Sequence, residues 1–165
     1  MKKLILFFAI TLICVNAQAQ VGLGLRATPD GGGFTIKPSI GRYLALEGQL
    51  NAGGIFSGSA GESFTGVLLL EFNIIMPDPS WRIFLGPGMH VGVWNRGWRY
   101  VGSEARYMDD NRGIFGMDGI MGVEYKFKKI PLGLSADIKP AVNFLPEAQF
   151  FDHNMFGLAA RVYFK

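Results

Sequence analysis

The sequence predicts an all-β protein, an eight-stranded antiparallel up-and-down transmembrane β-barrel. Three observations predict it: apolar and polar residues alternate with a period of two along most of the chain, the segment after residue 19 contains no run of 18 apolar residues, and short connections alternate with long ones. The 23 glycines among 165 residues also favour turns and close backbone approaches over helices.

Residues 1–19 read as a cleaved secretory signal peptide. Lys2 and Lys3 precede an apolar run that reaches Val15, and Ala17-Gln18-Ala19 forms a small-residue cleavage site. The run is shorter than the roughly 20 apolar residues that a membrane-spanning helix needs. The expected organisation is therefore a signal peptide over 1–19 and a barrel domain over 20–165.

Cleavage after Ala19 would remove the only cysteine, Cys14, and with it any disulfide or thiol chemistry. Thr11 and Ile13 do not match the residues that a lipoprotein signal needs before its cysteine. The loss of two lysines leaves 14 basic and 13 acidic residues, which is not the charge of a nucleic-acid-binding protein.

Eight stretches show the alternation of a half-exposed strand, and clusters of Gly, Pro, Asn and Asp separate them. The predicted strands are 21–28, 34–40, 43–52, 66–76, 81–94, 114–127, 132–143 and 155–164. A glycine-rich turn is predicted at 29–33 and a long loop at 95–113. Pro38, Pro87 and Pro140 each remove a ladder donor, so we expect bulges or frayed ends there.

Sorting the strands by parity separates two faces. One is apolar, with residues such as Leu68, Leu70 and Phe72, and the other carries eleven charged residues. These are Arg26, Lys37, Glu47, Glu71, Arg82, Asp118, Glu124, Lys126, Asp137, Lys139 and Arg161. Ile114 and Ile120 are apolar exceptions on the charged face.

Three features place the apolar face outward, against lipid. The charged face is rich in glycine, which makes room in a crowded lumen, its charges nearly balance, and aromatic residues gather near strand ends, as they do at membrane interfaces. We expect the eleven charged residues to form a lumenal salt-bridge network that leaves no wide pore. The opposite arrangement, a soluble periplasmic lipocalin-like binder, is the alternative.

The glycine-rich first strand, the segment Tyr43 to Gly48 and the ending Ala160 to Phe164 resemble the small eight-stranded outer-membrane barrels, the OmpA-like and OmpX-like proteins, in the form found in Bacteroidota. The resemblance covers the chain after residue 19. It implies a location in the outer membrane of a Gram-negative cell, contact with membrane lipid and lipopolysaccharide, and folding by the barrel-assembly machinery. The last strand ends on an aromatic residue, as that machinery's signal does, although Lys165 follows Phe164.

The sequence offers little for catalysis. His90 lies on the charged parity without the serine two residues later that lipid A deacylase barrels carry, since position 92 is glycine. His153 follows Asp152 in a loop, a spacing too sparse for a metal site. We therefore expect no enzymatic activity, no cofactor and no metal.

The long loop mixes aromatic and basic residues in a way that suits glycans and phosphates. Aromatic rings stack on sugars and arginine pairs bidentately with phosphate. The residues that we single out for surface-glycan or lipid contact are Trp94, Arg96, Trp98, Arg99 and Tyr100. The predicted function is a monomeric barrel with a structural or surface-interaction role, and the alternative is binding or passage of small hydrophobic molecules.

Overall fold

The computed structural model describes residues 20–29, 31–53, 63–94, 97–101, 104–108, 112–145, 149–150 and 155–164. For residues 63, 94, 97–101, 104–108 and 149–150 it describes the backbone alone. The predicted signal peptide, residues 1–19, lies outside the described residues.

The described chain forms strands throughout, with no helix. The strands are β1 (Val21–Thr28), β2 (Gly31–Pro38), β3 (Leu44–Gly53), β4 (Ser63–Ile75), β5 (Trp81–Trp94), β6 (Gly97–Val101), β7 (Glu104–Met108), β8 (Arg112–Lys126), β9 (Leu132–Ile138), β10 (Ala141–Leu145), β11 (Gln149–Phe150) and β12 (Phe156–Phe164).

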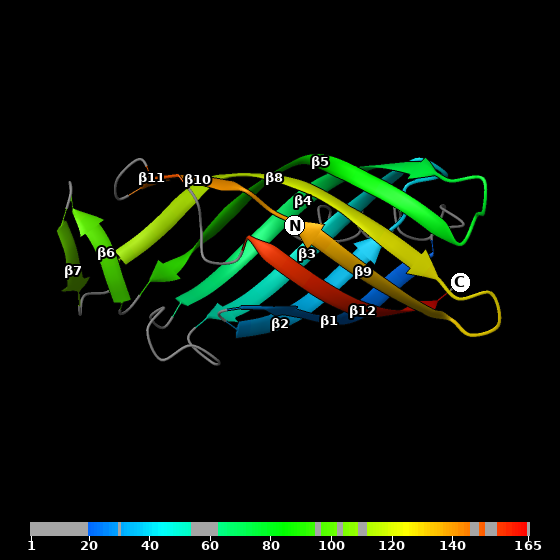
Figure 1. The fold of residues 1–165 in the computed structure, drawn as a ribbon, viewed down its shortest axis with the longest axis horizontal. Helices are drawn as coiled ribbons and strands as arrows, with labels where there is room; N and C mark the ends of the chain where they lie inside the picture. Colours follow the sequence, from blue (N-terminus) through cyan, green and yellow to red (C-terminus); the bar gives the residue numbers. More distant parts are fainter. Residues whose placement is uncertain are drawn as a thin grey trace, which may run out of the picture.

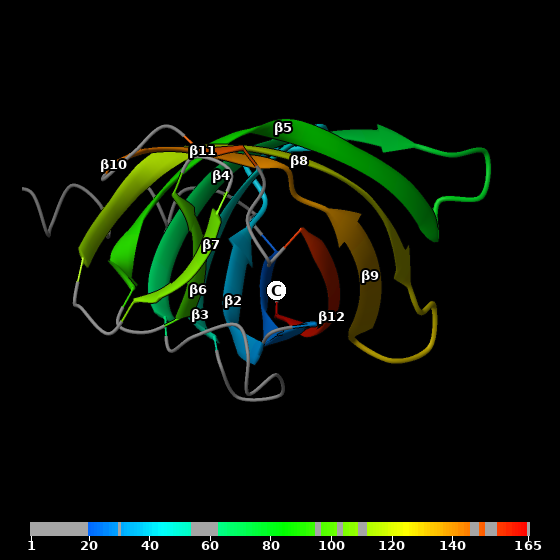
Figure 2. The ribbon, with the colours of Figure 1, turned by 60° about the vertical axis from the view of Figure 1, so that its left-hand side comes forward.

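The strands close into an eight-stranded antiparallel barrel in the order β1-β2-β3-β4-β5-β8-β9-β12, as the sequence predicts (Figure 1). The last strand pairs with the first from Val21↔Phe164 to Ala27↔Leu158, which removes the free edges that an open sheet would have. Figure 2 shows the strands curving around a common axis. We call the end that holds Val21 and Phe164 the turn end, and the opposite end the loop end.

β9 and β10 are two parts of one barrel strand. Both pair with β8 in the same register, Met121↔Ile138 and Asp118↔Ala141, and Pro140 interrupts the strand between them without shifting it. The N–H of Gly119 still donates to the carbonyl of Pro140, at 2.9 Å. The register shift lies farther on, between Asn143 and Leu145.

The three prolines therefore behave differently from one another. Pro38 is the last residue of β2, as expected of a frayed end. Pro87 stays within β5 and pairs with Gly119 of β8. On its other side the β4–β5 pairing lapses after Leu69↔Gly88 and resumes in the same register, so Pro87 makes no bulge. A missing N–H costs one hydrogen bond, and the flanking bonds keep the register.

Two sequence-based boundaries are wrong. The pair Thr28↔Gly31 makes the first turn two residues long, so Gly31, Gly32 and Gly33 belong to β2. A run of glycines has no alternating side chains to reveal a strand. The predicted loop 95–113 contains a hairpin of β6 and β7, with Trp98 paired to Tyr107; tyrosine and valine favour strands, and the intervening Gly-Ser favours a turn.

The two faces of the barrel differ sharply in exposure. Leu68 and Phe72 are 52% and 47% exposed, whereas Glu71 between them and Arg161 across the barrel are 0% and 1% exposed. Large apolar side chains cover the outer surface from β1 to β12. At the turn end, the Tyr125 ring packs against Trp81 and Phe127, with centroids 4.9 Å apart in both pairs. The apolar parity thus faces outward and the charged parity inward.

Candidate functional site in the barrel interior

Nine of the eleven charged residues singled out from the sequence are buried inside the barrel. The other two, Arg82 of β5 and Lys126 of β8, are half-buried near the turn end. Alternation along each strand brings these side chains together, because every second residue points inward and neighbouring strands are in register.

Arg161 of β12 holds the first group of contacts, near the turn end. Its Nη2 lies 2.6 Å from Oε1 of Glu47 in β3, and its Nη1 donates to the Ser135 hydroxyl at 2.8 Å. The same Glu47 oxygen accepts hydrogen bonds from the Thr35 hydroxyl and the Gln49 amide, both at 2.8 Å. Oε1 of Glu47 therefore accepts hydrogen bonds from donors on three strands.

Lys37 of β2 links this group to two further carboxylates. Its ammonium lies 2.6 Å from Glu71 and 3.7 Å from Glu124, and it sits 4.2 Å from the centroid of the Phe84 ring. The Tyr163 hydroxyl donates to Glu124. Lys126 belongs to the same group. Its Nζ lies 3.5 Å from the centroid of the Tyr163 ring and 3.9 Å from Glu124.

A second group lies nearer the loop end. Asp118 of β8 accepts from Lys139 at 2.9 Å and contacts Nδ1 of His90 at 2.9 Å, while Nε2 of His90 lies 2.7 Å from the side-chain oxygen of Asn143. Both ring nitrogens of His90 are thus engaged inside the barrel. Arg26 pairs separately with Asp137 through both carboxylate oxygens.

An apolar cluster, which the sequence analysis missed in part, lies between the two charged groups. It consists of Val67, Leu69, Phe84 and Ile120, all buried. Leu69 neighbours Glu47 in the β3–β4 ladder, and Val67 neighbours His90 in the β4–β5 ladder. The signal was present, since residues 67–70 are four consecutive apolar residues that break the alternation.

Inward-facing glycines leave the space that large interior side chains occupy. A Cβ at Gly22 would lie 2.7 Å from one edge of the Tyr163 ring, and a Cβ at Gly133 would lie 2.7 Å from the other. A Cβ at Gly122 would lie 2.5 Å from the tip of Phe84, and one at Gly157 would overlap the Arg26 guanidinium. The interior is packed so closely that an added methyl group at these positions would require the neighbouring side chain to move.

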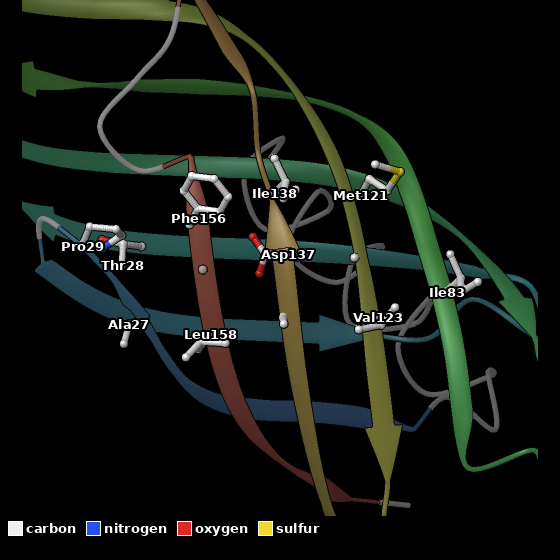
Figure 3. Close-up of a pocket in the computed structure, with 13 residues that line it drawn as sticks. Ala27, Thr28, Pro29, Ile83, Met121, Val123, Asp137, Ile138, Phe156 and Leu158 are labelled. Atoms are coloured by element: carbon white, nitrogen blue, oxygen red, sulfur yellow. The ribbon is translucent and has the colours of Figure 1, made fainter.

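A groove of about 680 Å³ crosses the outer face over β5, β8, β9 and β12. Figure 3 shows its apolar lining, which includes Ile83, Met121, Val123, Ile138, Phe156 and Leu158. Asp137 also lines it, because its ladder neighbours Gly122 and Gly157 have no side chains and leave the wall thin there. The Arg26–Asp137 pair therefore lies between the groove on the outer face and the lumen.

The proposed surface-contact residues fall outside the described side chains. Arg96 is not described, and for Trp94, Trp98, Arg99 and Tyr100 only the backbone of β5 and β6 is described. Within the described ranges, no group of three or more His, Cys, Asp or Glu side chains is arranged to hold a metal ion. The described residues also contain no helix long and apolar enough to cross a membrane.

This closed, helix-free barrel has the fold of the small eight-stranded outer-membrane barrels. Among solved structures it is similar to the N-terminal β-barrel domain of Pseudomonas aeruginosa OprF, with a TM-score of 0.61 and 12% sequence identity over 88% of this chain and 96% of that one. No family model matches the chain, and no curated protein matches it. The likeness establishes the fold, and the Bacteroidota form remains a prediction.

Proposed function

We propose that the protein is an outer-membrane barrel with a structural or surface-interaction role and without a wide pore. One observation carries the proposal: large apolar side chains cover the outside of a closed barrel whose inside holds paired charges. Soluble monomers rarely expose contiguous apolar patches larger than a few hundred Å². In lipid, by contrast, a closed barrel satisfies every backbone group. A lipocalin-like soluble binder would need the opposite orientation.

The interior supports the absence of a wide pore. Eight strands enclose a lumen that side chains can fill, and here guanidinium, ammonium, carboxylate and ring groups from the eight barrel strands meet within hydrogen-bonding distance. Under this proposal the barrel is a monomer without enzymatic activity. Its partners are membrane lipid, lipopolysaccharide at residues 94–100, and the barrel-assembly machinery.

Fractionation, gel migration and conductance test this proposal together. We expect the protein in the outer-membrane fraction, with faster migration in SDS before boiling than after it, because a closed barrel resists SDS. In planar bilayers the purified protein should give no large, stable channels. A protein recovered in the soluble periplasmic fraction would contradict the location, and stable channels of porin size would contradict the filled lumen.

The groove on the outer face favours a second candidate, the binding of small hydrophobic molecules. A concave, mostly apolar site that includes one charged side chain, here Asp137, is typical of ligand pockets. Replacing Ala136, which lines the groove, with phenylalanine should weaken binding of a fluorescent fatty acid about tenfold by filling the site. Ala160→Phe is the matched control, since Ala160 is exposed on the same outer face outside the groove. Equal binding by both variants would exclude the groove as the binding site.

A further inference from the structure

Cations outnumber carboxylates at the turn end of the barrel interior. Toward the loop end, Arg26 pairs with Asp137 and Lys139 pairs with Asp118. Toward the turn end, four cations lie near three carboxylates, and three of the four cations form ion pairs with them. The cations are Lys37, Arg82, Lys126 and Arg161, and the carboxylates are Glu47, Glu71 and Glu124.

Arg82 is the cation left over. It stands opposite Glu124 in the β5–β8 ladder, but Glu124 is already engaged by Tyr163, Lys37 and Arg161. Nε of Arg82 is buried and finds no hydrogen-bond acceptor in the described part of the chain. A buried donor without an acceptor is costly, so a site of this kind is stabilised when an anion enters it.

Arg82 lines a recess of about 500 Å³ at the turn end. Three lysines line the same recess: Lys126, which projects from β8, and Lys128 and Lys129 in the turn that follows it. Ser80 also lines the recess, and its Oγ is buried without a hydrogen-bond partner among the described residues. Four cations and Ser80 therefore line one space.

The nearby acid Asp78 offsets only one of these charges. Its carboxylate lies 3.2 Å from Nζ of Lys128 and accepts a hydrogen bond from the Ser80 N–H at 3.0 Å. These two contacts, the Ser80 N–H first, hold the pKa of Asp78 below its ordinary value, so it is ionised at neutral pH. Lys129 and Arg82 remain without a carboxylate among the described residues.

We propose that this recess, formed by Arg82, Lys126, Lys128, Lys129 and Ser80, is a binding site for a phosphate-bearing anion. A guanidinium with several ammonium groups and a hydroxyl is the donor set that recognises phosphate oxygens. The phosphate belongs either to a free anion in solution or to an anionic lipid headgroup of the adjacent leaflet. Both present the same oxygens to the recess.

NMR amide shifts of the folded barrel test the proposal in a phosphate-free maltoside detergent. Titration with inorganic phosphate should move the signals of Ser80, Arg82 and Lys126, whereas chloride at equal ionic strength should not. A parallel arm uses nanodiscs of zwitterionic phosphatidylcholine with and without anionic phosphatidylglycerol. Shifts with inorganic phosphate identify a free-anion site, and shifts with phosphatidylglycerol alone identify a headgroup site. The absence of shifts in both arms overturns the proposal.

The variants Arg82→Gln and Lys129→Gln should each weaken the response, by about tenfold for the half-buried arginine and less for the exposed lysine. Lys129 lies in an exposed turn, so K129Q keeps the test valid even if R82Q fails to fold. Arg42→Gln is the matched control, because Arg42 is an exposed cation in another turn at the same end and does not line the recess. An equal loss in R42Q would show nonspecific attraction and overturn the site.

Discussion

Replacing Arg161 with methionine is expected to destabilise the folded barrel by about 3–5 kcal/mol, because the change removes one partner of a buried ion pair and leaves a charge behind. Arg161 is 1% exposed and is the closest cation to Glu47, at 2.6 Å. Without it, Glu47 keeps only the hydroxyl of Thr35, the amide of Gln49 and a lysine 4.0 Å away. Urea unfolding in lipid vesicles would measure the loss.

Two further variants test whether the loss of stability comes from the unpaired carboxylate of Glu47. Adding Glu47→Gln to Arg161→Met should recover a large part of the stability, since the unpaired carboxylate is then gone. Lys128→Gln breaks an exposed pair whose side chains are 67% and 51% accessible, and should change stability by less than about 1 kcal/mol. If Arg161→Met unfolded at the same urea concentration as Lys128→Gln, the buried network would not stabilise the barrel.

Leu68→Arg is expected to cost about 2–4 kcal/mol when the barrel is folded in a bilayer, the range for a basic residue near the bilayer midplane. Leu68 lies near the middle of β4 and is 52% exposed on the outer face. The cost arises because the guanidinium would replace an apolar side chain in contact with acyl tails. Equilibrium unfolding from vesicles measures it.

Leu68→Ala is the control for this substitution, since it removes the same side chain without adding a charge. The alanine variant should lose much less stability, because its outer face remains apolar. A soluble barrel would respond in the opposite way, as an exposed arginine in water is nearly neutral in effect. Equal stability of the arginine and alanine variants would therefore contradict the membrane assignment.

The fold could be predicted from the sequence because an apolar outer face and a polar interior impose a period of two on every strand of the barrel. The pattern over Val67–Phe72 illustrates both its strength and its limit. Leu68, Leu70 and Phe72 face outward as their parity predicts, but Val67 and Leu69 are apolar and face inward. Alternation reports which residues share a face, and it does not report what fills the interior.

The contacts inside the barrel could not be predicted at the level of pairs. The sequence identifies Glu124 and Arg82 as inward-facing, yet their partners depend on strand tilt and on which side chain reaches across the lumen. Glu124 accepts from Tyr163, a residue that sequence reasoning did not single out, and Arg82 is left without an acceptor in the described chain. Several donors can reach the same carboxylate in the folded barrel, and a single sequence does not show which of them binds it.

Sequence identity of 12% to a barrel of the same fold has a physical explanation. Acyl chains are a uniform solvent, so any large apolar residue serves on the outer face. The constraint is on pattern and strand length. Interior residues must fit one another, but many combinations of charge and volume achieve this.

The Tyr163 ring lies between Gly22 and Gly133, so the residues allowed at these three positions depend on one another. A methyl group at residue 22 or 133 is compatible with the barrel only if residue 163 becomes smaller, and a smaller residue 163 would leave a void that both glycines border. In natural variants of this chain, a larger side chain at residue 22 or 133 should therefore accompany a smaller one at residue 163. The total side-chain volume of the three positions should stay nearly constant. Such correlated exchange would identify true relatives where overall similarity has faded.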